Sequence, residues 1–565
     1  MPNETWDLVI KNGRVVDGTG LAAFHADIAV KDGRIARIGR ADGPAAKTID
    51  ADGALVTPGF IDVHTHYDVQ LDWDPTASPS AWHGVTTVLT GNCGFTLAPS
   101  KPEDVPWLAG MLSRVEGMSK EALAEGFTFA GGSFDDFWSR LEGKIGVNAA
   151  GYVGHCAVRR YVMGDDASER ECTSEELEAM KELVRQSMRE GAIGFSTSQL
   201  DLHVGEDGRE VPCNHASRQE IIELCSVLAE FDYGAIEIIP RSHAEGHDEA
   251  DRAMLLEMYA VSGKPIELGI LAPTPNNPMA WQNTLDFVRE SAAGGARIHP
   301  QFTTQKLGLH LKLADTFVFD EMPEWRSVLT SPEPSRSEQL RDPVVRARLQ
   351  TEWDSPEVRN VAFDLGELEV EATHSPEFES RVGRSLQSLA DERGASVLDT
   401  FLDISLEEEL QTSFQIATSD AGREFMAHVV SSTIADPLVM AGSSDGGAHL
   451  ASFVGADYTT RLITDWVPDV LSLEQAVWRL AGMPAAVHGL VDRGTLRVGA
   501  KADINIIDLD TLKAGDNYLA RDFPADTERY VVDAEGYIAT IVNGEVLMEH
   551  GKYTGATPGE VIRGA

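Results

Sequence analysis

The chain of 565 residues is 42% hydrophobic and 24% charged, a composition typical of a globular protein large enough for more than one compact unit. Its net charge of −43 argues against nucleic acid and anionic membranes as partners, because both are bound by basic patches. No stretch approaches the ~20 uninterrupted apolar residues that a membrane span needs.

The cysteines and the first residues indicate the compartment. The five cysteines are too few and too irregularly spaced for a disulfide framework: Cys93, Cys156, Cys172, Cys213 and Cys225. Residues 1–7 carry acids and lack the basic-then-apolar pattern of a signal peptide. We therefore expect a cytoplasmic protein that does not contact membranes.

Both ends of the chain are predicted to consist of short strands. In residues 5–56, alternating segments are separated by the turn signals Asn12-Gly13, Asp32-Gly33 and Asp52-Gly53. Similar strands return near the other end, at residues 502–507, 530–532 and 538–542. Neither end has enough residues for a core of its own. We therefore expect residues 1–56 and 490–565 to form one small β-sandwich.

Between these ends, apolar strands alternate with helices. The predicted strands cover residues 60–63, 86–90, 147–153, 192–196, 235–239, 265–271, 296–299 and 438–442. A helix over residues 174–189 is indicated by Thr173 and the acids that follow it, and it ends before Gly191. Eight strands with helical crossovers predict an α/β fold, a (β/α)8 TIM-like barrel over residues 57–489. A doubly wound open sheet is the alternative, but no glycine-rich phosphate fingerprint follows any strand.

Residues 303–408 interrupt this alternation. The segment is charged, contains helix-like pieces such as residues 344–353, and is too long for an ordinary loop. Because it precedes the last predicted strand, we expect an inserted subdomain near the mouth of the barrel.

The first barrel strand ends in His64-Thr65-His66. Residues i and i+2 of an extended strand project from the same face, so both imidazoles point the same way. Two imidazoles on one face suit a divalent metal, although the spacing alone is also compatible with two polar loop residues.

Other strand ends carry further polar residues, and barrel enzymes place their catalytic groups at these ends. The candidates at the later strands are Cys93, His155, His203, Arg241, His243, Asp445 and His449. The accumulation of metal-competent side chains at one end of the predicted barrel favours an active site more strongly than any one of them.

Several motifs resemble those of the amidohydrolase superfamily, and most closely its N-acyl-D-amino-acid deacylase (D-aminoacylase) branch. The motifs are Gly59-Phe60-Ile61-Asp62-Val63-His64-Thr65-His66, Gly91-Asn92-Cys93-Gly94, Val153-Gly154-His155, Ser444-Asp445-Gly446 and the run 493–503. The resemblance covers nearly the whole chain apart from the predicted insert, and the Gly-Asn-Cys-Gly turn is the more specific marker of the branch.

The resemblance implies a zinc-dependent hydrolase with one or two ions, in which His64, His66 and Cys93 ligate metal. Imidazole and thiolate suit Zn²⁺, which lowers the pKa of a bound water and polarises a carbonyl. The resemblance makes Asp445 a metal ligand, the catalytic base, or both; as the base it would take a proton from water and pass it to the leaving amine. The expected reaction is cleavage of a linear amide C–N bond in an N-acyl-D-amino acid, a small-molecule substrate.

The chain departs from the family pattern at the fifth and sixth strands. The family places a histidine at the end of each, whereas residues 237–241 and 268–272 contain none. His243 is a candidate replacement for the first, and nothing replaces the second. The number of metal ions therefore stays open.

Other roles rest on position alone. His155, His203, His449, Arg159 and Arg241 are candidate substrate-binding residues, the arginines for a carboxylate and otherwise for surface salt bridges. A cyclic amide (hydantoin-like) or lactone hydrolase is an alternative activity. A metal-poor relative that binds a ligand without turnover is an alternative of another class. The sequence leaves open whether the protein is a homo-oligomer.

Overall fold

The computed structural model describes residues 5–271, 277–302, 308–416 and 420–564. Residues 1–4 and 565 of the predicted sandwich, residue 272 after the sixth strand, and residues 303–307 of the predicted insert lie outside the described part of the chain.

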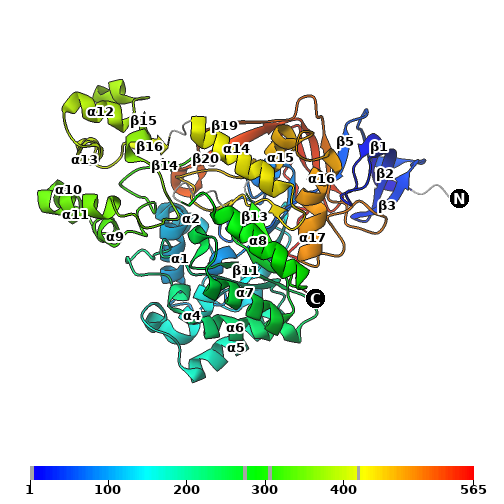
Figure 1. Cartoon of the computed structure of the whole chain (residues 1–565). Helices are drawn as coiled ribbons and strands as arrows, with labels where there is room; N and C mark the ends of the chain where they lie inside the picture. Colours follow the sequence, from blue (N-terminus) through cyan, green and yellow to red (C-terminus); the bar gives the residue numbers. More distant parts are fainter. Residues whose placement is uncertain (1–4, 272–276, 303–307, 417–419, 565) are drawn as a thin grey trace.

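The centre of the molecule is a barrel of parallel strands, as predicted (Figure 1). Six strands pair in the order β17-β13-β12-β11-β10-β9 and three in the order β6-β7-β8. A parallel bridge between Thr65 and Gly446 joins the first strand to the last, and Tyr152 alone separates β8 from β9. The strands are β6 (Phe60–Asp62), β7 (Val85–Thr90), β8 (Asn148–Gly151), β9 (Val153–Gly154), β10 (Gly194–Ser198), β11 (Ala235–Ile239), β12 (Ile266–Leu268), β13 (Ile298–Phe302) and β17 (Met440–Ala441).

Helices cover the outside of this barrel, so its strands are buried on both faces and read as continuous apolar runs. The predicted helix begins after Thr173, whose side chain and that of Glu176 form a capping box. The helices after the later strands are α4 (His155–Met163), α5 (Ser174–Arg189), α6 (Arg218–Ser226), α7 (Glu249–Ser262), α8 (Ala280–Ala293), α14 (Asp420–Ile434), α15 (Tyr458–Trp466), α16 (Leu473–Val477) and α17 (Met483–Val487). Between β7 and β8 lie α1 (Val105–Val115), α2 (Lys120–Gly126) and α3 (Phe134–Ser139).

The two ends of the chain form one nine-stranded sheet, in which β18 pairs antiparallel with β5. Its core combines residues of both ends, including Ile10, Val56, Ile504 and Ile541. The strands are β1 (Trp6–Val15), β2 (Phe24–Lys31), β3 (Arg34–Gly39), β4 (Ala45–Asp50), β5 (Leu55–Pro58), β18 (Ile504–Ile507), β21 (Tyr537–Val542), β22 (Glu545–Glu549) and β23 (Lys552–Tyr553).

One pair of C-terminal strands leaves this sheet. β19 (Lys513–Phe523) and β20 (Thr527–Glu535) pair only with each other and pack against the barrel, where the buried Arg529 donates to the carbonyl of Ser78. The strand expected at residues 530–532 therefore exists but contacts the barrel, because Tyr530 N also donates to Leu450 O.

The segment between β13 and α14 is built largely of helices and projects from one end of the molecule, opposite the N-terminal strands (Figure 1). Its three-stranded sheet has the order β14-β16-β15. Its elements are β14 (His310–Leu311), α9 (Pro323–Leu329), α10 (Ser335–Arg341), α11 (Pro343–Trp353), β15 (Leu368–Ala372), α12 (Leu386–Arg393), α13 (Val397–Glu407) and β16 (Ser413–Ile416).

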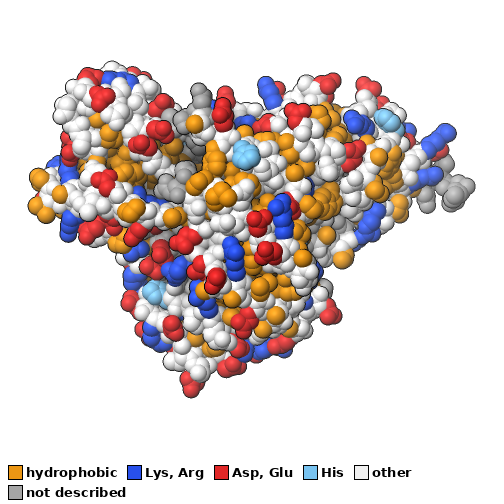
Figure 2. Space-filling model, viewed as in Figure 1, with side chains coloured by type: hydrophobic (Ala, Val, Ile, Leu, Met, Phe, Trp, Pro, Cys, Tyr) orange, Lys and Arg blue, Asp and Glu red, His pale blue; other side chains and the backbone are white. Residues whose placement is uncertain are grey.

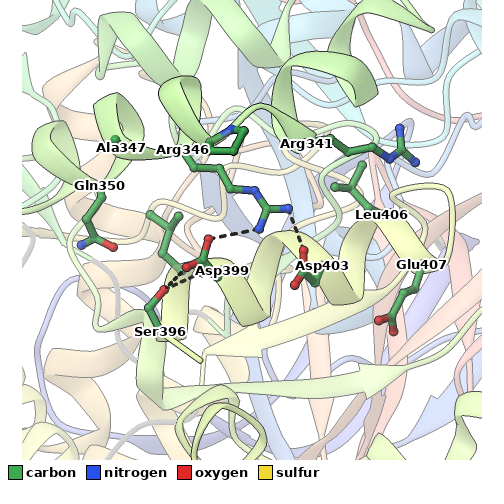
Figure 3. A pocket seen from close by; sticks show the side chains of 11 residues that line it. Arg341, Arg346, Ala347, Gln350, Ser396, Asp399, Asp403, Leu406 and Glu407 are labelled. Carbon is green, nitrogen blue, oxygen red and sulfur yellow. Dashed lines mark hydrogen bonds and ion pairs between the residues drawn. The ribbon is translucent and has the colours of Figure 1, made fainter. Parts of the chain in front are cut away.

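A cavity of about 880 Å³ lies within this segment, between α11 and α13 (Figure 3). Arg346 of α11 crosses it and pairs with Asp399 and Asp403 of α13. All its lining residues fall within 341–407, so it contains none of the candidate site residues.

Acidic and basic side chains are intermixed on the face shown in Figure 2, where no basic patch stands out. Among the described residues, no helix combines the length and apolar character needed to cross a membrane.

Candidate metal centre

The His-x-His pair lies directly beyond β6, and the end of β17 brings Asp445 against it. Asp445 N donates to His64 O at 3.1 Å, so the two strand ends are joined by backbone as well as by side chains. Asp445 Oδ1 lies 3.1 Å from His66 Nε2 and 3.7 Å from His64 Nε2. Both imidazoles are buried, and the Asp445 side chain is 11% exposed.

Cys93 joins this pair from the turn after β7. Its Sγ lies 3.5 Å from His64 Nε2, and one ligand atom from each of His64, His66 and Cys93 fits within 4.8 Å of the others. Asn92 fixes the turn by donating its side-chain amide to Thr65 O and to the carbonyl of Leu89, both at 3.1 Å. The Gly-Asn-Cys-Gly turn is thereby tied to the His-x-His loop.

The backbone at this centre is strained at non-glycine residues. Cys93, Asp445 and His449 have φ of 57°, 52° and 48°, in the left-handed region that favours glycine. Such residues persist where the surroundings hold them, and they concentrate at functional sites.

The outer nitrogen of each imidazole faces a residue that the sequence motifs did not identify. His64 Nδ1 hydrogen-bonds Gln301 Oε1 at 2.7 Å, and His66 Nδ1 lies 3.2 Å from Glu116 Oε1. Gln301 is the next-to-last residue of β13, two residues beyond the end of the strand predicted at residues 296–299, so extending that strand to residue 301 would have found it. Glu116 is the residue that caps the C-terminus of α1, and no sequence signal separates it from other acids.

Burial and the neighbouring charges shift the pKa values of these groups in opposite directions. Burial would lower the pKa of His66, but the carboxylates of Glu116 and Asp445 raise it to about 9. Burial raises the pKa of Glu116. It opposes ionisation of Asp445 too, but the hydrogen bond from His66 holds that pKa well below its usual range. Burial also raises the pKa of the Cys93 thiol.

These residues fit a bound zinc ion. Two imidazoles, a thiol and a carboxylate are ligands that Zn²⁺ takes. Carboxylates and a thiol are buried together here, and the only cationic groups that pair with Asp445 and Glu116 among the described residues are imidazoles. A divalent cation would balance that charge.

His449 and His203 lie beside the centre. His449 Nε2 is 3.7 Å from Asp445 Oδ2, and its ring stacks on Phe317 of the inserted segment at 4.2 Å. His203 accepts or donates a hydrogen bond with Ser198 Oγ at 3.1 Å and contacts Phe95. Burial lowers the pKa of His203 to about 3.

His155 and Arg159 lie in a different cluster around Glu220. His155 Nδ1 bonds Thr197 Oγ1 at 2.8 Å and its Nε2 bonds Glu220 Oε1 at 3.0 Å. The Arg159 guanidinium bonds both oxygens of Glu220 and the carbonyls of Ala167 and Arg170. All three ionisable side chains are buried, so this arrangement leaves them no open face toward a substrate.

Arg241 and His243 follow β11 at the rim. Arg241 pairs with Asp201, and its side chain is 43% exposed. The His243 ring contacts His247. Among the described residues, it is not part of the cluster formed by His64, His66 and Cys93.

The fifth and sixth strands carry buried carboxylates. Glu237 on β11 pairs in register with Glu267 on β12. Glu237 Oε2 accepts from Cys93 N at 2.6 Å, and Glu267 Oε2 accepts from Tyr152 OH at 2.9 Å. Glu237 of the fifth strand thus contacts the cysteine turn through the backbone N–H of Cys93.

Comparison with known proteins places the chain. The profile of the amidohydrolase family matches residues 47–325 and 393–548. The chain belongs to the amidohydrolase family. The unmatched residues 326–392 of this amidohydrolase fall within the inserted segment, and residues 1–59 match the N-terminal domain of the urease alpha-subunit.

Full-length relatives of this amidohydrolase include D-aminoacylases, as the motifs indicated. It is 28% identical to the D-aminoacylase of Alcaligenes xylosoxydans xylosoxydans, over 99% of this chain and 98% of that protein. An uncharacterised protein of Mycobacterium tuberculosis is 29% identical over 98% of this chain and 93% of its own length. A solved D-aminoacylase, described for the role of its binuclear metal center, has a TM-score of 0.66 at 27% identity and covers 99% of this chain and 100% of its own.

Proposed function

We propose that this amidohydrolase is a zinc-dependent enzyme that cleaves the linear amide bond of an N-acyl-D-amino acid. The observation that carries the proposal is the convergence of His64, His66 and Cys93 within 4.8 Å, with Asp445 Oδ1 3.1 Å from His66 Nε2. The D-amino-acid substrate is suggested by the full-length relatives, and the buried site suits a small molecule.

The residues that would hold zinc are His64, His66, Cys93 and Asp445. Bound zinc supplies Lewis-acid chemistry, activating water and polarising a carbonyl. His243 stays outside the proposed set because its ring contacts His247 instead. Among the described residues, His64, His66 and Cys93 form one such cluster, which favours one ion per chain over two.

Asp445 is the proposed proton carrier. It takes a proton from the water whose oxygen attacks the acyl carbon, and it returns that proton to the nitrogen as the C–N bond breaks. The products are a carboxylate and a free amino group. His449 lies against Asp445 Oδ2 and is placed to orient that carboxylate or to contact the substrate.

The protein is proposed to act in the cytoplasm. All five cysteines are free, so the fold uses no disulfide among the described residues, as is usual for proteins of that compartment.

The test is a panel of N-acetyl-D-amino acids, their L-enantiomers, cyclic amides and lactones, run with the zinc content measured by mass spectrometry. We expect D-selective hydrolysis at about one zinc per chain, loss after chelation, and recovery with added zinc. Cys93→Ser should bind zinc weakly, whereas the matched buried-thiol control Cys225→Ser should not differ from wild type.

Two other outcomes would replace the proposal. Hydrolysis confined to the cyclic substrates would establish the hydantoin-like or lactone activity. Zinc well below one per chain, with no turnover after metal addition, would establish a binding protein.

A further inference from the structure

The Nδ1 atom of each imidazole of the His-x-His pair faces a buried polar side chain. Gln301 Oε1 accepts from His64 Nδ1 at 2.7 Å, and Glu116 Oε1 lies at ion-pair distance, 3.2 Å, from His66 Nδ1. The Nε2 atoms of both rings face Asp445. A histidine that binds metal through one nitrogen commonly presents the other to a carboxylate, carbonyl or amide, which fixes its tautomer and orientation.

Glu116 is an unusual residue to bury. It is 2% exposed, and its recorded ion pairs in the described chain are with His66 at 3.2 Å and His449 at 3.9 Å. Its charge is therefore matched by imidazoles and by neither lysine nor arginine. A carboxylate taken out of water without a strong partner is costly, so its retention here calls for a role at the centre.

The placement of Glu116 is supported on several sides. Its N–H donates to Leu112 O at 2.8 Å and closes the last turn of α1. Arg114, two residues earlier, binds both carboxylate oxygens of Asp320 in the inserted segment. Ser113 Oγ donates to Met118 O at 2.7 Å and ties the helix end to the chain beyond it. The end of α1 is thus anchored while the Glu116 side chain reaches the centre.

We propose that Glu116 is a positioning residue for His66. Its carboxylate holds the Nδ1 side of the ring, so that Nε2 is presented beside Asp445 as the metal-binding atom. Glu116 acts through His66 and does not contact the reacting atoms. The inference rests on the proposed function only in taking His66 as a zinc ligand, and it adds a residue that the family motifs do not contain.

The experiment compares Glu116→Gln and Glu116→Ala with wild type. The matched control is Glu125→Gln, the same isosteric change at an exposed position of the neighbouring helix α2. Zinc dissociation constants are measured by competition with a chromophoric chelator. The Tm of the zinc-free proteins, and kcat and KM at saturating zinc, are measured in parallel.

We expect Glu116→Gln to weaken zinc binding about 10- to 100-fold, which is the usual cost of losing such an outer partner. Glu116→Ala should weaken it at least as much, and Glu116→Asp should recover part of the loss. Because the buried charge is removed, the Tm of the zinc-free variants should not fall, and kcat should return toward wild type as zinc is raised.

Zinc affinities within about twofold of wild type in folded Glu116→Gln and Glu116→Ala would overturn the inference. A loss of kcat that persists at saturating zinc, with zinc affinity unchanged, would overturn it in favour of a catalytic role. If wild type binds zinc but hydrolyses nothing in the panel, the proposed function fails while the affinity comparison still decides the role of Glu116.

Discussion

Two buried clusters of histidine and carboxylate lie at the ends of barrel strands, and they differ in how their hydrogen bonds and charges are satisfied. Around His155, both ring nitrogens have hydrogen-bond partners, and Glu220 is bound by the Arg159 guanidinium. Around His66, Nδ1 completes no aligned hydrogen bond, and the same is true of His449 Nδ1.

The difference separates structural ionisable groups from functional ones. Burial opposes the ionisation of Glu220, yet His155 and Arg159 hold its pKa at about 2, so the cluster is complete without a ligand. The Asp445 and Glu116 carboxylates are paired only with imidazoles among the described residues. The carboxylates around His66 therefore have charge left to bind a metal cation, whereas the charges around His155 are already balanced within the protein.

The largest effect is expected from Asp445→Asn. The backbone bond to His64 O is kept, but the proton acceptor is lost, so kcat should fall about 10²- to 10⁴-fold in a folded protein. Rates on the best substrate of the panel, circular dichroism and zinc content provide the measurement. Glu220→Gln is the matched change in the other cluster and should leave kcat per folded molecule near wild type. Near-wild-type turnover by Asp445→Asn would remove Asp445 from the mechanism.

The barrel and the strand-end residues of the metal centre were predictable because their sequence signals are local. Two histidines two residues apart at the end of a buried strand project from the same face. Asp445 follows the last strand, and strand ends of a barrel lie together at the site. The predicted strands agree with the observed ones to within a few residues. The strand predicted at residues 530–532 lies in β20, which pairs with β19 and not with the sheet of the chain ends, because the sequence of a strand does not specify which strand it pairs with.

The residues that face the outer nitrogens of the two histidines were not predictable, since they come from segments distant in the sequence. Glu116 meets His66 across 50 residues, and nothing near it in sequence marks a site. Arg159 shows the converse: its position after a strand end suggested a substrate contact, but Glu220, 61 residues away, occupies its guanidinium. Strand-end position alone does not say which charged group is already paired.

Arg159→Met should have the next largest effect, on stability. Removing the guanidinium leaves the buried Glu220 with His155 alone as its ion-pair partner, and breaking such a buried pair costs about 3–5 kcal/mol of unfolding free energy. Since the pKa of Glu220 is depressed to about 2, its contribution is complete above its unfolded pKa near 4.5 and is lost as pH falls toward 2. The difference between wild type and variant, from denaturant unfolding, should therefore narrow below about pH 5. Arg189→Met, at an exposed position of α5, is the control, and a deficit no larger than that of the control would refute the structural role.

The smallest effect is expected from Arg241→Gln. This variant tests whether the Arg241 guanidinium, which follows β11, acts together with the cluster around His66. Arg241 already pairs with Asp201 and donates to Asn214 O at 3.0 Å, with 43% of its side chain exposed. Exposed pairs contribute about 0–1 kcal/mol, so stability should change little and KM should stay within about twofold. Asp201→Asn is the informative companion, because it frees Arg241 without removing it. If Arg241 binds the substrate carboxylate, Arg241→Gln would raise KM tenfold or more for N-acyl amino acids while Asp201→Asn left it unchanged or lower. That pattern would show that an arginine serves the cluster around His66 as well, so that the two clusters would differ less in how their charges are balanced.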